Sequence, residues 1–146
     1  MDERVREHAE VLVDWSARVR AGDQVVMDVA EGAHDLAVAV AAELGERDAT
    51  LLTTYGSGEV GRAFLRGGDD DREFAHSEPK LAMLEAADVY LRIGGGRNTT
   101  ALADVDGDRR QQARKATTAT REPRRATYWV TTAHTTRTPP QHAGMA

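Results

Sequence analysis

A hydrophobic run that stops at three glycines constrains the fold more than any other part of the chain. Val89-Tyr90-Leu91-Arg92-Ile93 favours a β-strand, and Gly94-Gly95-Gly96 ends it. Helical patterns lie on both sides of this run, and two similar strands precede it. Because residues 87–93 are almost continuously hydrophobic, we expect them to be buried on both faces, as in a central strand of a parallel sheet.

The rest of the chain alternates between strand and helix patterns with short connections. Further strands are predicted at Gln24 to Ala30, at Thr50 to Tyr55 and around Tyr128-Trp129-Val130, and helices at 3–20, 33–44, 59–65, 77–86 and 108–120. Right-handed crossovers then give an α/β fold with a three-layer, doubly wound, mostly parallel sheet. We expect one α/β domain over residues 1–132 and an irregular tail over 133–146.

Composition excludes several classes of protein. The chain has no cysteine, which rules out disulfides, thiolate catalysis and Cys-ligated zinc. No stretch approaches the roughly 20 apolar residues of a membrane span, and the charged start, Met1-Asp2-Glu3-Arg4, does not resemble a secretory signal. We therefore expect a cytoplasmic protein with no membrane partner.

Charge is distributed unevenly along the chain. Residues 1–106 carry 22 acidic and 11 basic side chains, whereas residues 107–146 carry 2 acidic and 8 basic ones. All basic residues except Lys80 and Lys115 are arginine, so a halophilic origin and a GC-rich codon bias both remain open. The arginines of 109–121 are spaced like one helix face with no interleaved aromatics. This pattern favours a solvated or acid-facing helix and no nucleic-acid partner.

Two glycine loops could bind an anion. Gly56-Ser57-Gly58-Glu59-Val60-Gly61 matches the G-x-G-x-x-G pattern between a strand and a helix, but it follows the second predicted strand and places Glu59 where a pyrophosphate would lie. Gly94–Gly96 could present backbone N–H groups, yet no helix is predicted directly after it. A structural turn is the preferred interpretation of both loops. The alternative is a small nucleotide- or phosphate-binding module that uses Gly56–Gly61 or Gly94–Gly96.

No complete active site is visible in the residues. Asp104-Val105-Asp106-Gly107-Asp108 begins like a calcium loop, but its glycine is two positions early and Lys115 stands where the loop needs glutamate, so we expect a turn and a helix cap. No two histidines have metal-ligand spacing, and there is no nucleophile elbow or catalytic triad. We therefore assign no catalytic, cofactor-binding or metal-binding residue. The five histidines are His8, His34, His76, His134 and His142.

Several stretches together resemble one family of enzymes. Val13-Asp14-Trp15-Ser16 followed by Gly22-Asp23-Gln24-Val25-Val26 is similar to the opening of the thermophilic metallo-aminopeptidases, of the aminopeptidase T and leucyl aminopeptidase type. The similarity continues in order along the chain. Its further segments are 85–93 with Asn98-Thr99, then 109–116, Trp129-Val130-Thr131-Thr132 and Ala143-Gly144-Met145.

This resemblance implies a metal-dependent exopeptidase that removes N-terminal amino acids from peptides. Enzymes of the family are homodimers and use two divalent ions, zinc or cobalt, held in a C-terminal domain. The chain resembles only the N-terminal domain, so the resemblance implies an inactive fragment whose missing partner is the catalytic domain. Residues 117–146 depart from the family pattern. We therefore expect a truncated chain, a split subunit or the product of a decaying gene.

Overall fold

The computed structural model describes residues 1–94, 104–117, 123 and 126–131. Its centre is a four-stranded sheet with the strand order β2-β1-β3-β4 and every pair parallel. The strands are β1 (Gln24–Ala30), β2 (Thr50–Gly56), β3 (Val89–Gly94) and β4 (Ala126–Thr131). The predicted α/β fold with a parallel sheet is confirmed, and β3 lies inside the sheet as its hydrophobic run indicates.

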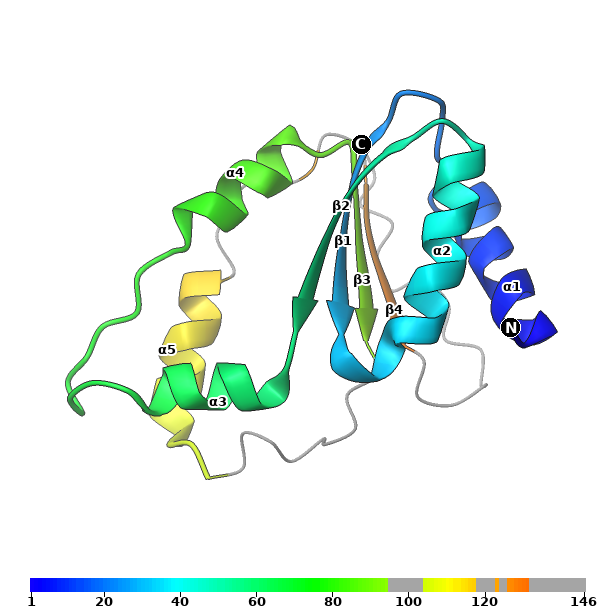
Figure 1. Ribbon diagram of the computed structural model, residues 1–146. Coiled ribbons are helices and arrows are strands. Elements are labelled where there is room, and N and C mark those ends of the chain that lie inside the picture. The colour runs from blue at the N-terminus through cyan, green and yellow to red at the C-terminus, as the bar shows by residue number, and fades with distance from the viewer. Residues whose placement is uncertain (95–103, 118–122, 124–125, 132–146) are drawn as a thin grey trace.

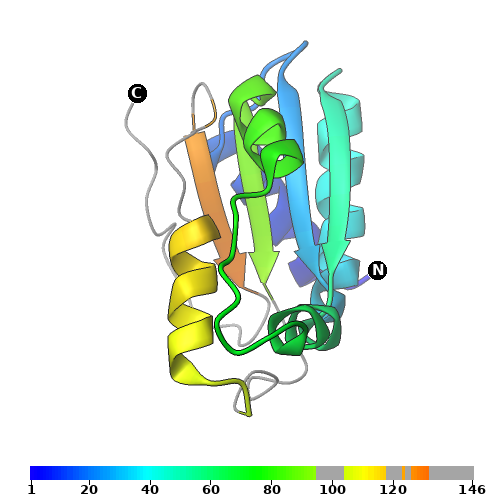
Figure 2. The same cartoon turned by 90° about the vertical axis from the view of Figure 1, so that its left-hand side faces the viewer.

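Helices cover both faces of this sheet and give three layers. The helices α1 (Glu3–Glu10) and α2 (His34–Glu46) lie on one side, called here the α2 face (Figure 1). On the opposite side, called the α4 face, lie α3 (Gly58–Arg66), α4 (Glu78–Ala86) and α5 (Gly107–Thr117), as the turned view also shows (Figure 2).

Most of the hydrophobic core lies under the α2 face. Alternate residues of β1 and β3 point into it, and the largest side chains there are almost fully buried because α2 packs directly over them. The α4 face has a smaller buried cluster of Val26, Ala87 and Tyr90, packed against Met83 and Leu84 of α4. The nine large side chains with the least exposure are Met27, Leu44, Leu91, Ile93, Val13, Val25, Val29, Val40 and Val89.

The prediction that β3 is buried on both faces is confirmed at every large side chain except Arg92. Val89, Leu91 and Ile93 are completely buried and Tyr90 is 6% exposed, but the side chain of Arg92 is 47% exposed. In the turned view α4 lies over the amino-terminal half of the strands (Figure 2), whereas Arg92 lies toward the carboxyl-terminal end of β3.

The N-terminal helix is shorter than the predicted 3–20. Asp2 caps α1, since its side chain accepts the N–H of Arg4 at 3.0 Å. The chain then widens into a π-helical turn, η1 (Val11–Ser16), and stops before Arg18, whose φ is 47°. An α-helix cannot continue through a left-handed residue, so the amphipathic pattern overestimated the helix length.

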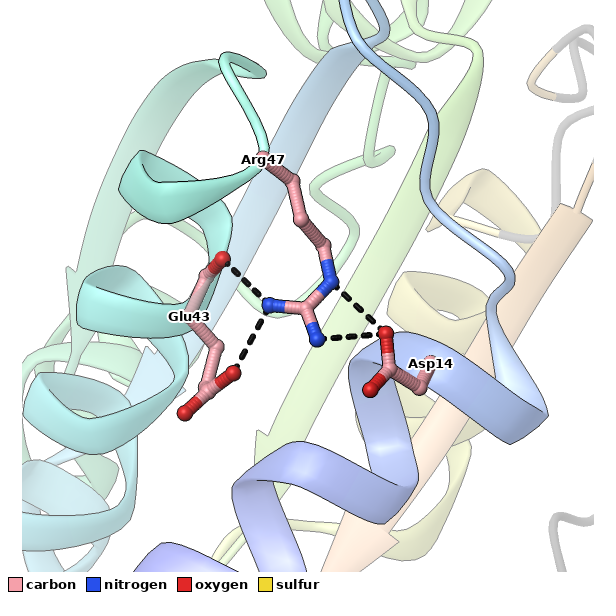
Figure 3. A network of polar contacts seen from close by, with 3 residues as sticks. All are labelled: Asp14, Glu43 and Arg47. Atoms are coloured by element: carbon pink, nitrogen blue, oxygen red, sulfur yellow. Dashed lines mark hydrogen bonds and ion pairs between the residues drawn. The ribbon is translucent and has the colours of Figure 1, made fainter.

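Arg47 joins η1 to the end of α2. Its Nε donates to Asp14 Oδ1 at 2.7 Å, and its Nη1 donates to Glu43 Oε2 at 2.7 Å (Figure 3). The hydrogen bond to Asp14 raises the pKa of the Arg47 guanidinium.

Helix α2 continues through Gly45 to Glu46, although the sequence predicted its end at residue 44. The left-handed turn after the helix lies at Asp48, with φ 56°.

The basic helix α5 exposes Arg110, Arg114 and Lys115, as predicted for a solvated helix, but Arg109 differs. Arg109 is buried and donates to backbone carbonyl oxygens at the end of α3 and in the loop that follows it. The acceptors are Leu65 at 2.8 Å, Gly67 at 3.2 Å and Gly68 at 3.3 Å, with a further bond to Asp69. Arg109 is therefore neither solvated nor directed at acidic side chains. Arg121 lies outside the described residues.

Candidate functional site

The Gly56–Gly61 segment has the strand–turn–helix context of a phosphate loop but not its packing. Ser57 caps α3, and its Oγ accepts the N–H of Val60 at 3.3 Å. Glu59 lies in the first helical turn, where its charge opposes an anion. A Cβ placed on Gly56 or Gly61 would meet no atom within 4 Å, so neither position needs glycine for close packing. Gly94 ends β3, while Gly95 and Gly96 lie outside the described residues.

The calcium-like segment forms a turn and the start of α5. Asp106 Oδ1 accepts the N–H of Asp108 at 3.3 Å. Asp104 accepts hydrogen bonds from Arg62 Nε at 2.8 Å and from Arg66 Nη1 at 3.2 Å. The hydrogen bond from Arg62 is the main reason that the pKa of Asp104 falls to about 2. Its carboxylate is therefore engaged in ion pairs between α3 and the start of α5.

The three described histidines lie apart from one another. His8 lies in α1, His34 begins α2 with its Nδ1 3.2 Å from the Tyr55 hydroxyl, and His76 is hydrogen-bonded to the carbonyl of Ala116. His134 and His142 lie outside the described residues. Among the residues that are described, no three His, Asp or Glu side chains are grouped so that they could hold a metal ion.

A polar cluster on the α4 face was missed by sequence reasoning. Asp28 accepts hydrogen bonds from Thr54 Oγ1 at 3.0 Å and from the Tyr90 hydroxyl at 3.2 Å, and the Arg92 Nε lies 4.0 Å from its carboxylate. Burial, and then the charge of Asp28, raise the pKa of Tyr90, which keeps this hydroxyl protonated as a donor. The cluster ties three adjacent strands together and presents one partly exposed cation.

The sequence contained one indirect sign of this polar cluster. Asp28 and Arg92 are charged residues inside strands that are otherwise apolar. The register pairs them with each other, so both side chains point to the same face. That register, not the pattern of either strand, brings the two charges together.

The residues that carry the family resemblance hold the amino-terminal ends of the strands. Gly22 has φ 80° and donates its N–H to Asp48 O at 3.0 Å, which a residue with a side chain would do only with strain. The buried Asp23 accepts the N–H of Arg20 at 2.7 Å. Asp88 accepts the N–H of Gln24 at 2.8 Å and so fixes β3 beside β1. These motifs therefore build the sheet.

Comparison with family models extends the family resemblance over almost the whole chain. The model of the thermophilic metalloprotease (M29) family matches residues 1–138. This chain belongs to the M29 family. The M29 chain is also similar in fold to wild-type AmpT from Thermus thermophilus, with a TM-score of 0.70 and 20% sequence identity. No curated protein matches it significantly.

The M29 chain covers only part of that structure. The alignment includes 89% of this chain but 36% of the Thermus protein, so the chain spans about a third of the length of its structural relative. The family description implies metal ions, and the described residues of this chain do not supply a suitable group of ligands for them. In the part of the chain that is described, no helix combines the length and hydrophobicity that a membrane crossing requires.

Proposed function

We propose that this chain is the N-terminal, non-catalytic α/β part of a metal-dependent aminopeptidase that removes N-terminal amino acids from peptides. The observation that carries the proposal is the M29 match over residues 1–138 in a chain that spans 36% of the Thermus protein. Residues 1–132 form the α/β scaffold in this proposal, and residues 133–146 lead toward the catalytic part. The protein acts in the cytoplasm as a homodimer.

The catalytic metals of this proposal, two zinc or cobalt ions, are held by residues outside this chain. The described histidines support this, since His8 lies in α1, His34 in α2 and His76 between α3 and α4, and none is grouped with two further potential ligands. Titration of the 146-residue chain with zinc or cobalt should show no tight binding of two ions. Sub-micromolar binding of two ions per chain would contradict the proposal, because both metals would then be held here.

A phosphate-binding module is the second candidate function, and the Ser57-capped start of α3 directly after β2 is the observation in its favour. The occupied Val60 N–H and the Glu59 carboxylate weigh against it. Calorimetry with NAD and ATP should show no binding. Micromolar binding that is lost in Gly58→Ala but kept in Gly45→Ala would favour the second candidate instead.

A further inference from the structure

The strand order of the sheet changes direction between β1 and β3. In the order β2-β1-β3-β4, β1 is followed in the chain by β2 on one side, and β3 is followed by β4 on the other. Figures 1 and 2 show the consequence: α2, which follows β1, lies on one face of the sheet, whereas α5, which comes between β3 and β4, lies on the opposite face. Open parallel sheets bind ligands beside the carboxyl ends of the two strands at such a point.

One charged pair spans these two strands near their carboxyl ends. Asp28 of β1 is in register with Arg92 of β3, and both side chains lie on the α4 face. Asp28 is held in place, since the Thr54 and Tyr90 hydroxyls donate to it at 3.0 and 3.2 Å. The Arg92 Nε lies 4.0 Å from its carboxylate, which is an ion-pair distance and too long for a hydrogen bond. Asp28 therefore attracts the guanidinium without accepting a hydrogen bond from its Nε.

The next residues toward the carboxyl ends leave room beside this pair. On the α4 face the positions beyond Asp28 and Arg92 are Gly56, Ala30 and Gly94, of which Gly56 and Ala30 pair with each other. None of the three has a side chain larger than a methyl group. A Cβ placed on Gly56 would meet no atom within 4 Å, so the space over that end of β2 is open. A ligand therefore has space next to the charged pair.

The charges around this space favour a planar anion with a single charge. Arg92 is the more accessible partner, with 47% of its side chain exposed against 27% for Asp28, and a guanidinium binds a carboxylate through two parallel N–H donors. Asp28 balances the charge of Arg92. Glu31 and Glu59, in the first turns of η2 (Glu31–Ala33) and α3, add negative charge after β1 and β2. A doubly charged phosphate is therefore disfavoured relative to a carboxylate.

We propose that Arg92, with its charge balanced by Asp28, binds a carboxylate group at this end of the sheet. The source of the carboxylate rests on the function proposed above. An aminopeptidase holds the amino end of a peptide at its metals, so the carboxyl end of the peptide lies away from them, beside another part of the protein. The carboxylate that Arg92 binds is the C-terminus of a short peptide substrate.

NMR titration of the chain with peptides, without metal, tests this site. Leucyl-glycyl-glycine should shift the Arg92 Nε–H resonance, and the same peptide with a C-terminal amide should bind about tenfold more weakly, because it lacks only the carboxylate. Acetate should shift the same resonance, and inorganic phosphate should bind no more tightly than acetate. Equal binding of the free and amidated peptides, or an Arg92 resonance that does not move, would overturn the proposal. Tighter binding of phosphate than of acetate would overturn the choice of a carboxylate.

Variants of the pair sharpen the test. Arg92→Gln should abolish the preference for the free peptide over the amide, and Arg92→Lys should keep part of it, since an ammonium retains the charge but not the two parallel donors. Arg110→Gln, at an exposed arginine of α5, is the matched control and should keep the full preference. A folded Arg92→Gln chain that keeps the preference would overturn the proposal.

Asp28→Asn tests the balancing charge. Without that charge, binding of phosphate should strengthen more than binding of acetate, a change of ratio that loss of a merely structural contact would not produce. An unchanged ratio would overturn the role of Asp28. Since none of these readouts uses peptidase activity, Arg92 can fail to bind a carboxylate while the proposed function stands.

Discussion

The α2 face of the sheet and the α3–α5 region on its opposite side are stabilised by different chemistry. On the α2 face, aliphatic side chains of β1, β3 and α2 are almost fully buried. On the other side, α3 has no buried residue, and Val60 and Phe64 are 70% and 59% exposed. Arginines there connect α3 to α5 and to the loop between α3 and α4.

Each arginine makes a different kind of contact. Arg109 donates to carbonyl oxygens of residues 65–69, and Arg62 pairs with Asp104. The guanidinium of Arg72 lies 4.6 Å from the ring centre of Phe64 and 4.7 Å from that of Phe74. The comparison indicates one region that is stable by hydrophobic burial and a second that depends on oriented polar contacts, so the second should open first.

The largest effect is expected at the centre of the first region. Leu91→Asp places a carboxylate at a completely buried position of β3, which costs several kcal/mol of a total stability of about 5–15 kcal/mol. Circular dichroism should show a chain without a cooperative thermal transition. Val60→Asp, at the exposed site on α3, is the control and should melt close to the wild type. Folded Leu91→Asp protein would contradict the division into two regions.

A smaller effect is expected from Arg109→Gln in the second region. The change removes the charged donor of several partly buried carbonyl oxygens and should cost about 1–3 kcal/mol. We expect faster hydrogen exchange in residues 65–69 and in α5, with amides of β1 and β3 unchanged. Arg110→Gln, an exposed neighbour on the same helix, should have no such effect. Equal acceleration in β3 would show that the two regions open as one.

The bounds of strand β1, on the hydrophobic side, could be predicted from the sequence more closely than the arginine contacts of the α3–α5 region. Alternation and turn residues placed β1 at Gln24–Ala30, because local chemistry determines a strand between Gly22 and the start of a helix. The partners of Arg109 lie about 40 residues earlier in the chain and are backbone oxygens, which no side-chain pattern reports. The Asp28–Arg92 proximity likewise depends on the β1–β3 register.

The smallest effect is expected at the surface pair of Arg62 and Asp104. The folded pKa of Asp104, about 2, lies below its ordinary value near 3.9, so the pair contributes stability above that ordinary value and loses it as the pH falls toward 2. Carboxyl NMR titration should find this low pKa, and Arg62→Gln should raise it toward the ordinary value. Arg66→Gln should raise it less. An unchanged pKa in Arg62→Gln would refute the assigned cause.

The most direct test of the proposed function is hydrolysis of leucine-p-nitroanilide in the presence of zinc or cobalt. The chain alone should give no hydrolysis that a chelator abolishes, because the catalytic metals are assigned to residues outside it. Co-expression with the C-terminal part of a related M29 protein should restore chelator-sensitive activity. Chelator-sensitive hydrolysis by the 146-residue chain alone would contradict the account and place an active site within it.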